Sequence, residues 1–279
     1  SLFDAVAHSF TTISTGGFST HDLSFAYFEN NSILLIAIIF MILGSFPFLV
    51  LAKTNFKNPF ASFKDHQVKI FLLLLLISIC LIYFFAQKYL MGSEIQKLII
   101  ISFNTISIIS GTGFICENFE GWGNYASTLF LILMFIGGCA GSTTGGIKIF
   151  RFQILFKYIA IHLKKMLQPH AVIASHFNGR KIQDSTYESV MIFFFIYVLT
   201  FAISTLLLSF SGLDFLTCFS AAASAISNVG PGLGEIIGPD GNYSSISNYS
   251  KIILILTMFL GRLEMLTILV LFIPSFWKS

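Results

Sequence analysis

The chain has 279 residues, of which 55% are hydrophobic and only 10% are charged, and its mean hydropathy is +0.84. Soluble globular domains carry about 25% charged residues, so this composition excludes a soluble domain and indicates an integral membrane protein. The net charge of +3 reflects the basic residues of a few connections, so we expect no nucleic-acid partner.

Five stretches are long and apolar enough to cross a bilayer as helices, which takes roughly 20 residues. Four of them contain no charged residue, and the fifth is interrupted by Arg262 and Glu264. The stretches are Asn30 to Ala52, Ile70 to Gln87, Gly121 to Ile147, Ser189 to Leu213 and Lys251 to Trp277. This pattern predicts an all-α integral membrane fold with about five spans.

The first predicted unit is a short helix over Phe3 to Thr12 followed by an inner helix over Ser32 to Ala52. The second unit begins with an outer helix over His66 to Lys88. It continues with a short helix over Glu94 to Ile109 and an inner helix from Tyr125. The short helices are too short and too polar to span the membrane, so we expect them to be re-entrant.

The third unit repeats this order, with an outer helix over Ser185 to Phe210, a short helix over Asp214 to Ile226 and an inner helix over Asn248 to Phe276. The chain therefore divides into residues 1–53, 54–165 and 166–279. A closed pore built from such units in a pseudo-fourfold arrangement would normally use four of them. We therefore expect the natural protein to be longer at its N terminus.

Each short helix is followed by the pattern Ile-Ser-x-x-Gly, and we call these segments the repeat loops: Ile13–Phe18, Ile109–Phe114 and Ile226–Pro231. They are similar to a degenerate form of the potassium-channel filter sequence Thr-Val-Gly-Tyr-Gly. A dehydrated cation needs a ring of carbonyl oxygens in place of its water, and glycine permits the backbone conformations that aim carbonyls inward.

Two further physical arguments favour a filter. Irregular backbone is tolerated at membrane depth only where it lines a cavity, and each short helix would point its negative C-terminal end at the ion. The alternative is that the glycines only cap helices or permit close packing. The predicted filter residues, whose carbonyls would bind K⁺, are Thr15, Gly16, Gly17, Gly111, Thr112, Gly113, Asn228, Val229 and Gly230.

A glycine-rich segment over Gly137 to Gly146 interrupts the inner helix of the second unit. Each glycine lowers helix stability by about 1 kcal/mol, and a polar break at membrane depth should face a cavity. We interpret the segment as a gating loop below the filter; a close-packed helix face is the alternative. The predicted gating residues are Gly137, Gly138, Gly141, Ser142, Thr143, Thr144, Gly145 and Gly146.

Arg262 lies within the last apolar stretch, where a charge is costly and indicates a functional site. We expect it to face the pore or to tether the glycine-rich segment through carbonyls. The alternative is a structural ion pair with a neighbouring helix. Glu264 would lie on a different helix face, so the two residues need not pair.

Charged residues predict the orientation of the chain. By the positive-inside rule, two basic connections are cytoplasmic, and the acids and the repeat loops lie outside, where the acids would concentrate cations. The cations of these connections are Lys53, Lys57, Lys64, Lys69, Lys148, Arg151, Lys157, Lys164, Lys165, Arg180 and Lys181. The acids are Asp4, Asp22, Glu29, Glu94, Glu117, Glu120, Asp214, Glu235 and Asp240.

The sequence carries no enzyme motif that we can identify: no His-Glu-x-x-His, no Gly-x-Ser-x-Gly and no paired intramembrane carboxylates. The four cysteines form no Cys-x-x-Cys pair, so no zinc site is indicated. We expect no catalysis and no cofactor on this chain. A secondary transporter for an organic solute is a rival, since broken helices also serve such proteins, but the repeat loops offer no evident group to recognise one.

The residues together resemble the Trk/Ktr/HKT superfamily of potassium transporters, most closely its bacterial TrkH-type subunit. The similarity rests on Ser14–Thr20, Ser110–Phe114, Gly137–Lys148, Asn228–Gly234, Gly261–Glu264 and Leu271–Lys278. It implies potassium uptake through one pore in the bacterial inner membrane, filter glycines at Gly17, Gly113 and Gly230, a gating loop and a pore-lining Arg262. It also implies a homodimer and a cytosolic nucleotide-binding regulatory subunit of the TrkA type. Because an upstream repeat bears on ion preference in this family, a sodium-permeable channel is an alternative.

Overall fold

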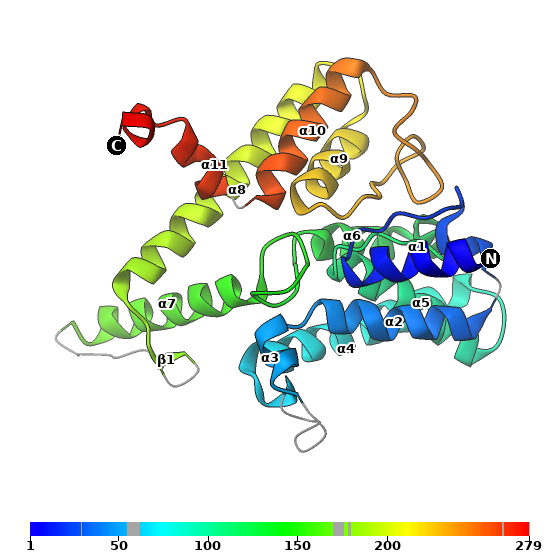
Figure 1. Cartoon of the computed structure of the whole chain (residues 1–279), viewed down its shortest axis with the longest axis horizontal. Coiled ribbons are helices and arrows are strands. Elements are labelled where there is room, and N and C mark those ends of the chain that lie inside the picture. Colours follow the sequence, from blue (N-terminus) through cyan, green and yellow to red (C-terminus); the bar gives the residue numbers. More distant parts are fainter. Residues whose placement is uncertain (29, 55–61, 170–175, 178–179, 264, 279) are drawn as a thin grey trace.

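The computed structural model describes residues 1–28, 30–54, 62–169, 176–177, 180–263 and 265–278, and these are mostly helical (Figure 1). Glu29, Lys57 and Glu264 lie outside the described residues. The α-helices are α1 (Leu2–Ile13), α2 (Asn31–Gly44), α3 (Phe48–Ala52), α4 (His66–Ala86), α5 (Glu94–Ile109), α6 (Asn124–Met134), α7 (Ile149–Leu167), α8 (Asp184–Ser209), α9 (Phe215–Ser227), α10 (Asn248–Arg262) and α11 (Met265–Leu271).

Shorter elements connect these helices. Between α7 and α8, two antiparallel two-residue strands pair, β1 (His176–Phe177) and β2 (Arg180–Lys181). The 3-10 helices are η1 (Ser24–Tyr27), η2 (Ser62–Lys64), η3 (Gln87–Tyr89), η4 (Phe119–Trp122) and η5 (Pro274–Lys278). Apart from the small strand pair, the described residues confirm the predicted all-helical fold.

The three predicted short helices are α1, α5 and α9, and side chains define where they begin. Ser1, Ser93 and Asp214 each accept a hydrogen bond from a backbone N–H in the first turn that follows. Such caps satisfy donors that the helix itself leaves unpaired. α5 packs against α2 and α4, and α9 packs against α8 and α10 (Figure 1). Each short helix is therefore held by longer helices beside it.

Membrane-length helices are fewer than the sequence predicted. Within the described residues, α4 and α8 are long and apolar enough to cross a membrane, and α10 with α11 would add a third span, although their axes are bent by 106°. The inner helices of the first and third units are therefore not continuous helices as predicted, whereas the interruption in the second unit was expected. Pro47 follows the end of α2 and starts α3, because proline cannot occupy a helix interior. α6 ends at Met134, just before the glycine-rich segment.

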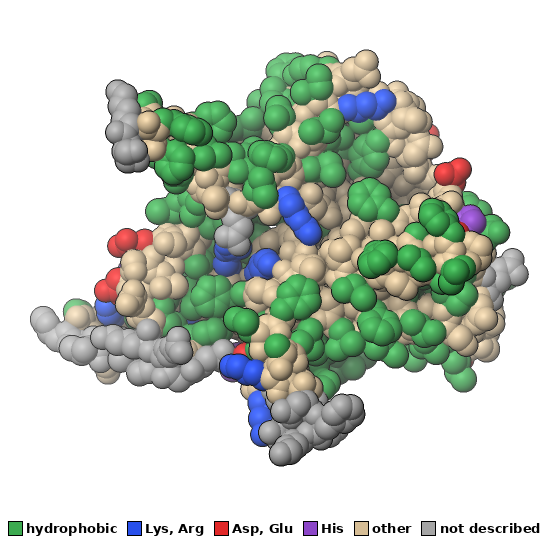
Figure 2. All heavy atoms as spheres, viewed as in Figure 1, with side chains coloured by type: hydrophobic (Ala, Val, Ile, Leu, Met, Phe, Trp, Pro, Cys, Tyr) green, Lys and Arg blue, Asp and Glu red, His purple; other side chains and the backbone are tan. Residues whose placement is uncertain are grey.

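Apolar side chains remain on the outer faces of the long helices. Leu76 and Phe84 of α4, and Phe195 and Leu206 of α8, are all exposed. Figure 2 shows hydrophobic side chains over much of the visible face, whereas Lys and Arg gather around a central hollow and toward one end. Apolar outer faces of this kind suit contact with lipid.

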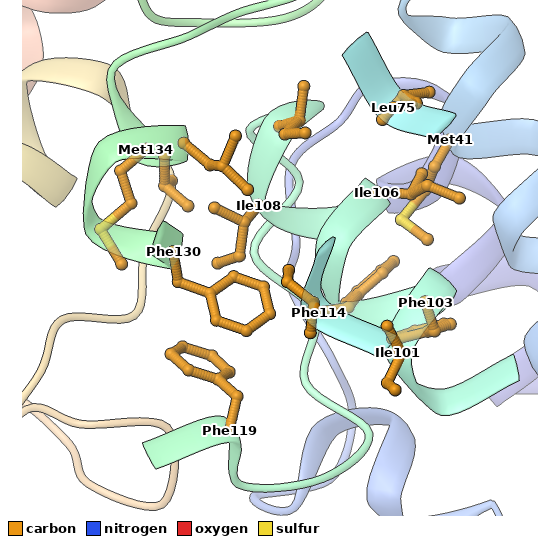
Figure 3. Packing of buried hydrophobic residues seen from close by; sticks show 14 of the residues in the cluster. Met41, Leu75, Ile101, Phe103, Ile106, Ile108, Phe114, Phe119, Phe130 and Met134 are labelled. Atoms are coloured by element: carbon orange, nitrogen blue, oxygen red, sulfur yellow. The ribbon is translucent and has the colours of Figure 1, made fainter. Parts of the chain in front are cut away.

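The largest hydrophobic core lies around α5. Phe103, Phe114, Phe119 and Phe130 are buried together (Figure 3), with the rings of Phe119 and Phe130 centred 4.3 Å apart. Phe114 is the last residue of the second repeat loop. The core therefore anchors this loop directly, which fixes the position of its glycines.

Candidate functional site

The three repeat loops meet at one cavity of about 580 Å³. Their segments are far apart in the sequence, but α1, α5 and α9 end at this common cavity, so their loops share its lining. The predicted filter residues that line it are Thr15, Gly16, Gly17, Thr112, Gly113, Asn228, Val229 and Gly230. Gly111 does not line this cavity; it is buried, and a Cβ added to it would lie 3.4 Å from the backbone nitrogen of Gly145.

Each repeat loop has left-handed backbone at two positions that are two residues apart. In the second loop both positions are glycine, Gly111 and Gly113, with φ of 66° and 81°. The first loop uses Thr15 and Gly17, and the third uses Asn228 and Gly230. Left-handed residues at these two positions give the loop peptide groups orientations that a regular helix or strand does not allow.

Two of these left-handed residues are not glycine. Thr15 has φ of 50° and Asn228 has φ of 55°. Asparagine tolerates this conformation, but a β-branched threonine there is strained. Strain of this kind is concentrated at functional sites. Sequence reasoning selected both residues for their place in the motif, but it gave no signal of the left-handed backbone at Thr15.

The residue between the two left-handed positions of each loop is hydrogen-bonded to the preceding short helix. Its N–H donates to the carbonyl five residues earlier, at 2.8 to 3.0 Å. These bonds direct the loop N–H groups back to the helix, so the loop carbonyls are the groups left to face elsewhere. The pairs are Gly16 with Thr11, Thr112 with Ser107, and Val229 with Ser224.

Sequence reasoning missed these three helix residues as functional residues. Each carries a hydroxyl and precedes the loop glycine by six positions, which is the signal that was available. Thr11 Oγ1 donates to the carbonyl of Phe18 at 2.9 Å, and Ser107 Oγ donates to the carbonyl of Phe114 at 2.7 Å. Ser224 Oγ instead accepts from the N–H of Gly230 at 3.0 Å.

The loop glycines also allow neighbouring loops to touch. A Cβ added to Gly17 would lie 1.8 Å from the carbonyl oxygen of Thr112, and one added to Gly113 would lie 1.8 Å from the carbonyl oxygen of Val229. Real Cβ atoms never approach an oxygen so closely. The first loop therefore lies against the second, and the second against the third.

The glycine-rich segment lies beside these loops and contacts all three, the second through Gly111, which packs against Gly145. Thr143 Oγ1 shares its one proton between two carbonyls, those of Ile13 at 3.2 Å and Gly44 at 3.1 Å. A Cβ added to Gly145 would lie 2.3 Å from the carbonyl oxygen of Ser227. The segment is thus held at the C-terminal ends of α1 and α9.

Some of the predicted gating residues line a second cavity, and the others do not. Ser142, Thr143, Thr144, Gly145 and Gly146 line this second cavity, which has a volume of about 180 Å³. The other three predicted gating residues, Gly137, Gly138 and Gly141, do not line this cavity and are held by hydrogen bonds. The N–H of Gly137 donates to the carbonyl of Ile147 at 2.9 Å, the N–H of Gly138 to Thr144 Oγ1 at 3.0 Å, and Gly141 accepts from the N–H of Phe48 at 3.0 Å.

Arg262 lies at the end of α10 and lines both cavities. Its side chain is exposed, and it forms no ion pair with a carboxylate of the described residues. Arg262 therefore borders both cavities, and its position beside a pore stays a prediction. Lys148 and Arg151 line the second cavity with it, and Lys148 Nζ donates to the carbonyl of Ser142 at 3.2 Å.

Three predicted outer acids lie at the rim of the first cavity. Asp22, Glu117 and Asp240 come from the connections that follow the three loops, and all line this cavity. Burial raises the pKa of the Glu117 carboxyl above its ordinary value, because a buried site disfavours the charged form. Among the residues that the structure describes, no cluster of His, Cys, Asp and Glu would hold a metal ion.

Known proteins of one family are similar to this chain over nearly its whole length. The profile of the TrkH family, described as a cation transport protein, matches residues 1–279. The Trk system potassium uptake protein TrkI of Halomonas elongata is 39% identical over 281 residues, and the TrkH proteins of Vibrio parahaemolyticus and Escherichia coli are 36% and 35% identical. These alignments cover 99% or more of this chain and 57% of each relative.

A solved structure is also similar. The crystal structure of the potassium transporter TrkH from Vibrio parahaemolyticus superimposes with a TM-score of 0.91 at 34% sequence identity. The match covers 99% of this chain and 59% of that chain. The chain therefore spans somewhat more than half the length of the relatives that it matches.

Proposed function

The chain belongs to the TrkH family of cation transport proteins, and from this premise we propose that it forms part of a potassium uptake pathway. The backbone carbonyls of the three repeat loops would replace the hydration shell of K⁺. The observation that carries the proposal is the left-handed pair that recurs in all three loops around one cavity. Carbonyls without obvious side-chain recognition groups suit a bare ion better than an organic solute.

We assign residues 1–53, 54–165 and 166–279 to three units of a pseudo-fourfold pore. Two observations support this division. The bond from each loop to its short helix spans five residues in every unit. The neighbouring loops are also in direct contact in chain order, as consecutive units around one axis would be.

The glycine-rich segment is proposed as the gate and Arg262 as a pore-lining charge. The segment borders the cavity next to the filter, and Arg262 borders both cavities. A fixed positive charge at this point would limit how long a cation dwells there. The polar contacts of Thr143 hold the segment in place and are weak enough to be exchanged during opening.

The intact protein is proposed to lie in the bacterial inner membrane as a homodimer that binds a TrkA-type nucleotide-binding regulatory subunit. These assignments rest on family membership, and the relatives are named as members of a Trk system. The exposed apolar side chains of α7, including Phe156 and Leu163, offer a surface for another protein or for lipid.

The proposal is tested with the intact protein that contains this chain, purified and reconstituted into liposomes. We expect an outward K⁺ gradient to drive saturable uptake of radioactive rubidium, with K⁺ competing far better than Na⁺. Equal competition by Na⁺ would assign a sodium-permeable channel instead. Uptake of an organic solute without any cation flux would contradict the proposal.

The outer acids yield a smaller prediction. Replacing Asp22 with asparagine should raise the K⁺ concentration at half-maximal uptake about two- to threefold at low ionic strength, because one attracting charge is lost from the rim. The shift should shrink when choline chloride is added, since salt screens exposed charges. Asp184→Asn, at the start of α8 and away from this cavity, is the matched control. If the K⁺ concentration at half-maximal uptake shifts equally with and without choline chloride, Asp22 has no electrostatic role.

A further inference from the structure

Both backbone polar groups of Gly230, its N–H and its carbonyl, are bound by side chains. The N–H of Gly230 donates to Ser224 Oγ at 3.0 Å, and the carbonyl of Gly230 accepts from the Tyr243 hydroxyl at 2.8 Å. Ser224 comes from α9, below the loop, whereas Tyr243 comes from the outer connection between α9 and α10. Two elements on different sides thus hold one loop residue.

This arrangement separates the third loop from the other two. In the first and second loops, the helix hydroxyls of Thr11 and Ser107 bind the carbonyl one residue beyond the glycine. Within the described part of the chain, no side chain donates to the carbonyl of Gly17 or Gly113. Gly230 is therefore the loop glycine whose carbonyl orientation is set by a side chain.

Tyr243 is itself held firmly enough to do this. Its ring packs against the buried cluster that contains Leu208, Cys218 and Ile246. The connection around it is tied by backbone bonds, including that from the N–H of Asn242 to the carbonyl of Ile236 at 3.1 Å. Burial raises the pKa of Tyr243 to about 12, so the hydroxyl keeps the proton that it donates at neutral pH.

We propose that Tyr243 is a positioning residue that sets the preference for K⁺ over Na⁺ by fixing the carbonyl of Gly230. This inference rests on the proposed function. A carbonyl oxygen has two lone pairs, so one can accept from Tyr243 while the other faces an ion. Na⁺ is smaller and needs ligands that move further inward, and a carbonyl held by a hydrogen bond resists that movement.

The test is Tyr243→Phe in the intact reconstituted protein, with K⁺ and Na⁺ uptake measured in the same vesicles. Losing one hydrogen bond should lower the ratio of K⁺ to Na⁺ uptake about two- to tenfold. The maximal rate of K⁺ uptake should change less than this ratio. Tyr249→Phe is the control, because Tyr249 is exposed on α10 and should leave the ratio unchanged.

An unchanged ratio in a Tyr243→Phe protein that still takes up K⁺ would overturn the inference. Should that variant fail to purify, Ser224→Ala removes the other side-chain bond to the backbone of Gly230, on the adjoining peptide group, and should shift the ratio in the same direction. An unchanged ratio there would overturn the inference equally. If the unaltered protein shows no saturable K⁺ uptake, the proposed function itself fails, which is a distinguishable result.

Discussion

Replacing Gly113 with alanine in the intact protein should reduce potassium uptake at least roughly tenfold, to little above background. The new Cβ would lie 1.8 Å from the carbonyl oxygen of Val229, on the neighbouring loop. Left-handed backbone at φ of 81° also costs an alanine about 1 to 2 kcal/mol. Overpacking commonly adds about 1 to 3 kcal/mol, and each 1.4 kcal/mol corresponds to a factor of ten.

Alanine substitutions at two other glycines serve as comparisons for Gly113→Ala. Gly16→Ala should cause a smaller loss, because its Cβ would meet nothing closer than Ser14 Oγ at 3.1 Å, within its own loop. Gly121→Ala, where nothing lies within 4 Å, should leave uptake unaffected. Rubidium uptake and membrane abundance are measured for each variant. Unimpaired uptake by a well-expressed Gly113→Ala protein would refute the assignment of this loop as a filter.

The short helices and their loops were predictable because local signals define them. The second short helix was predicted over Glu94 to Ile109, and α5 has these bounds. A serine cap and a glutamine three residues later mark its start, and the glycine-bearing motif marks its end. Caps and glycines act within a few residues, so sequence alone carries their information.

Breaks within the inner helices were harder to place. The first inner helix was predicted to run from Ser32 to Ala52, but it ends at Gly44 and resumes at Phe48. Pro47 was the available signal, and hydropathy concealed it because Pro47 lies between two phenylalanines in a largely apolar stretch. The last inner helix ends at Arg262, and α11 departs from its axis by 106°.

The site itself was predictable only in part. Motif spacing identified the loop glycines, but not the left-handed Thr15 or the contacts between loops, because these arise when distant segments pack together. The role of Tyr243 was not visible from sequence either. It lies 13 residues beyond Gly230 in an irregular connection, and nothing in the local pattern brings its hydroxyl back to that carbonyl.

Deleting Ser142, Thr143 and Thr144 should raise potassium uptake several-fold or more. These residues line the second cavity, and the Thr143 hydroxyl binds the carbonyls of Ile13 and Gly44. Without them, the segment loses both its bulk and its attachment. The size of the increase depends on how often the gate is open in the unaltered protein. If the gate is mostly closed the increase is large, and if it is mostly open the increase is small.

Thr143→Val isolates the attachment from the bulk, because valine has nearly the same shape but cannot donate. The hydroxyl has one proton, shared between the two carbonyls, so its loss counts as one hydrogen bond of about 0.5 to 1.5 kcal/mol. This would favour the open arrangement roughly two- to twelvefold in the equilibrium constant. Uptake should therefore rise in this variant too. Thr128→Val, which removes a hydroxyl that bonds only within α6, should leave uptake unchanged. Reduced or unaltered flux in both the deletion and Thr143→Val would mean that the segment serves packing, because a gate that is loosened must leak.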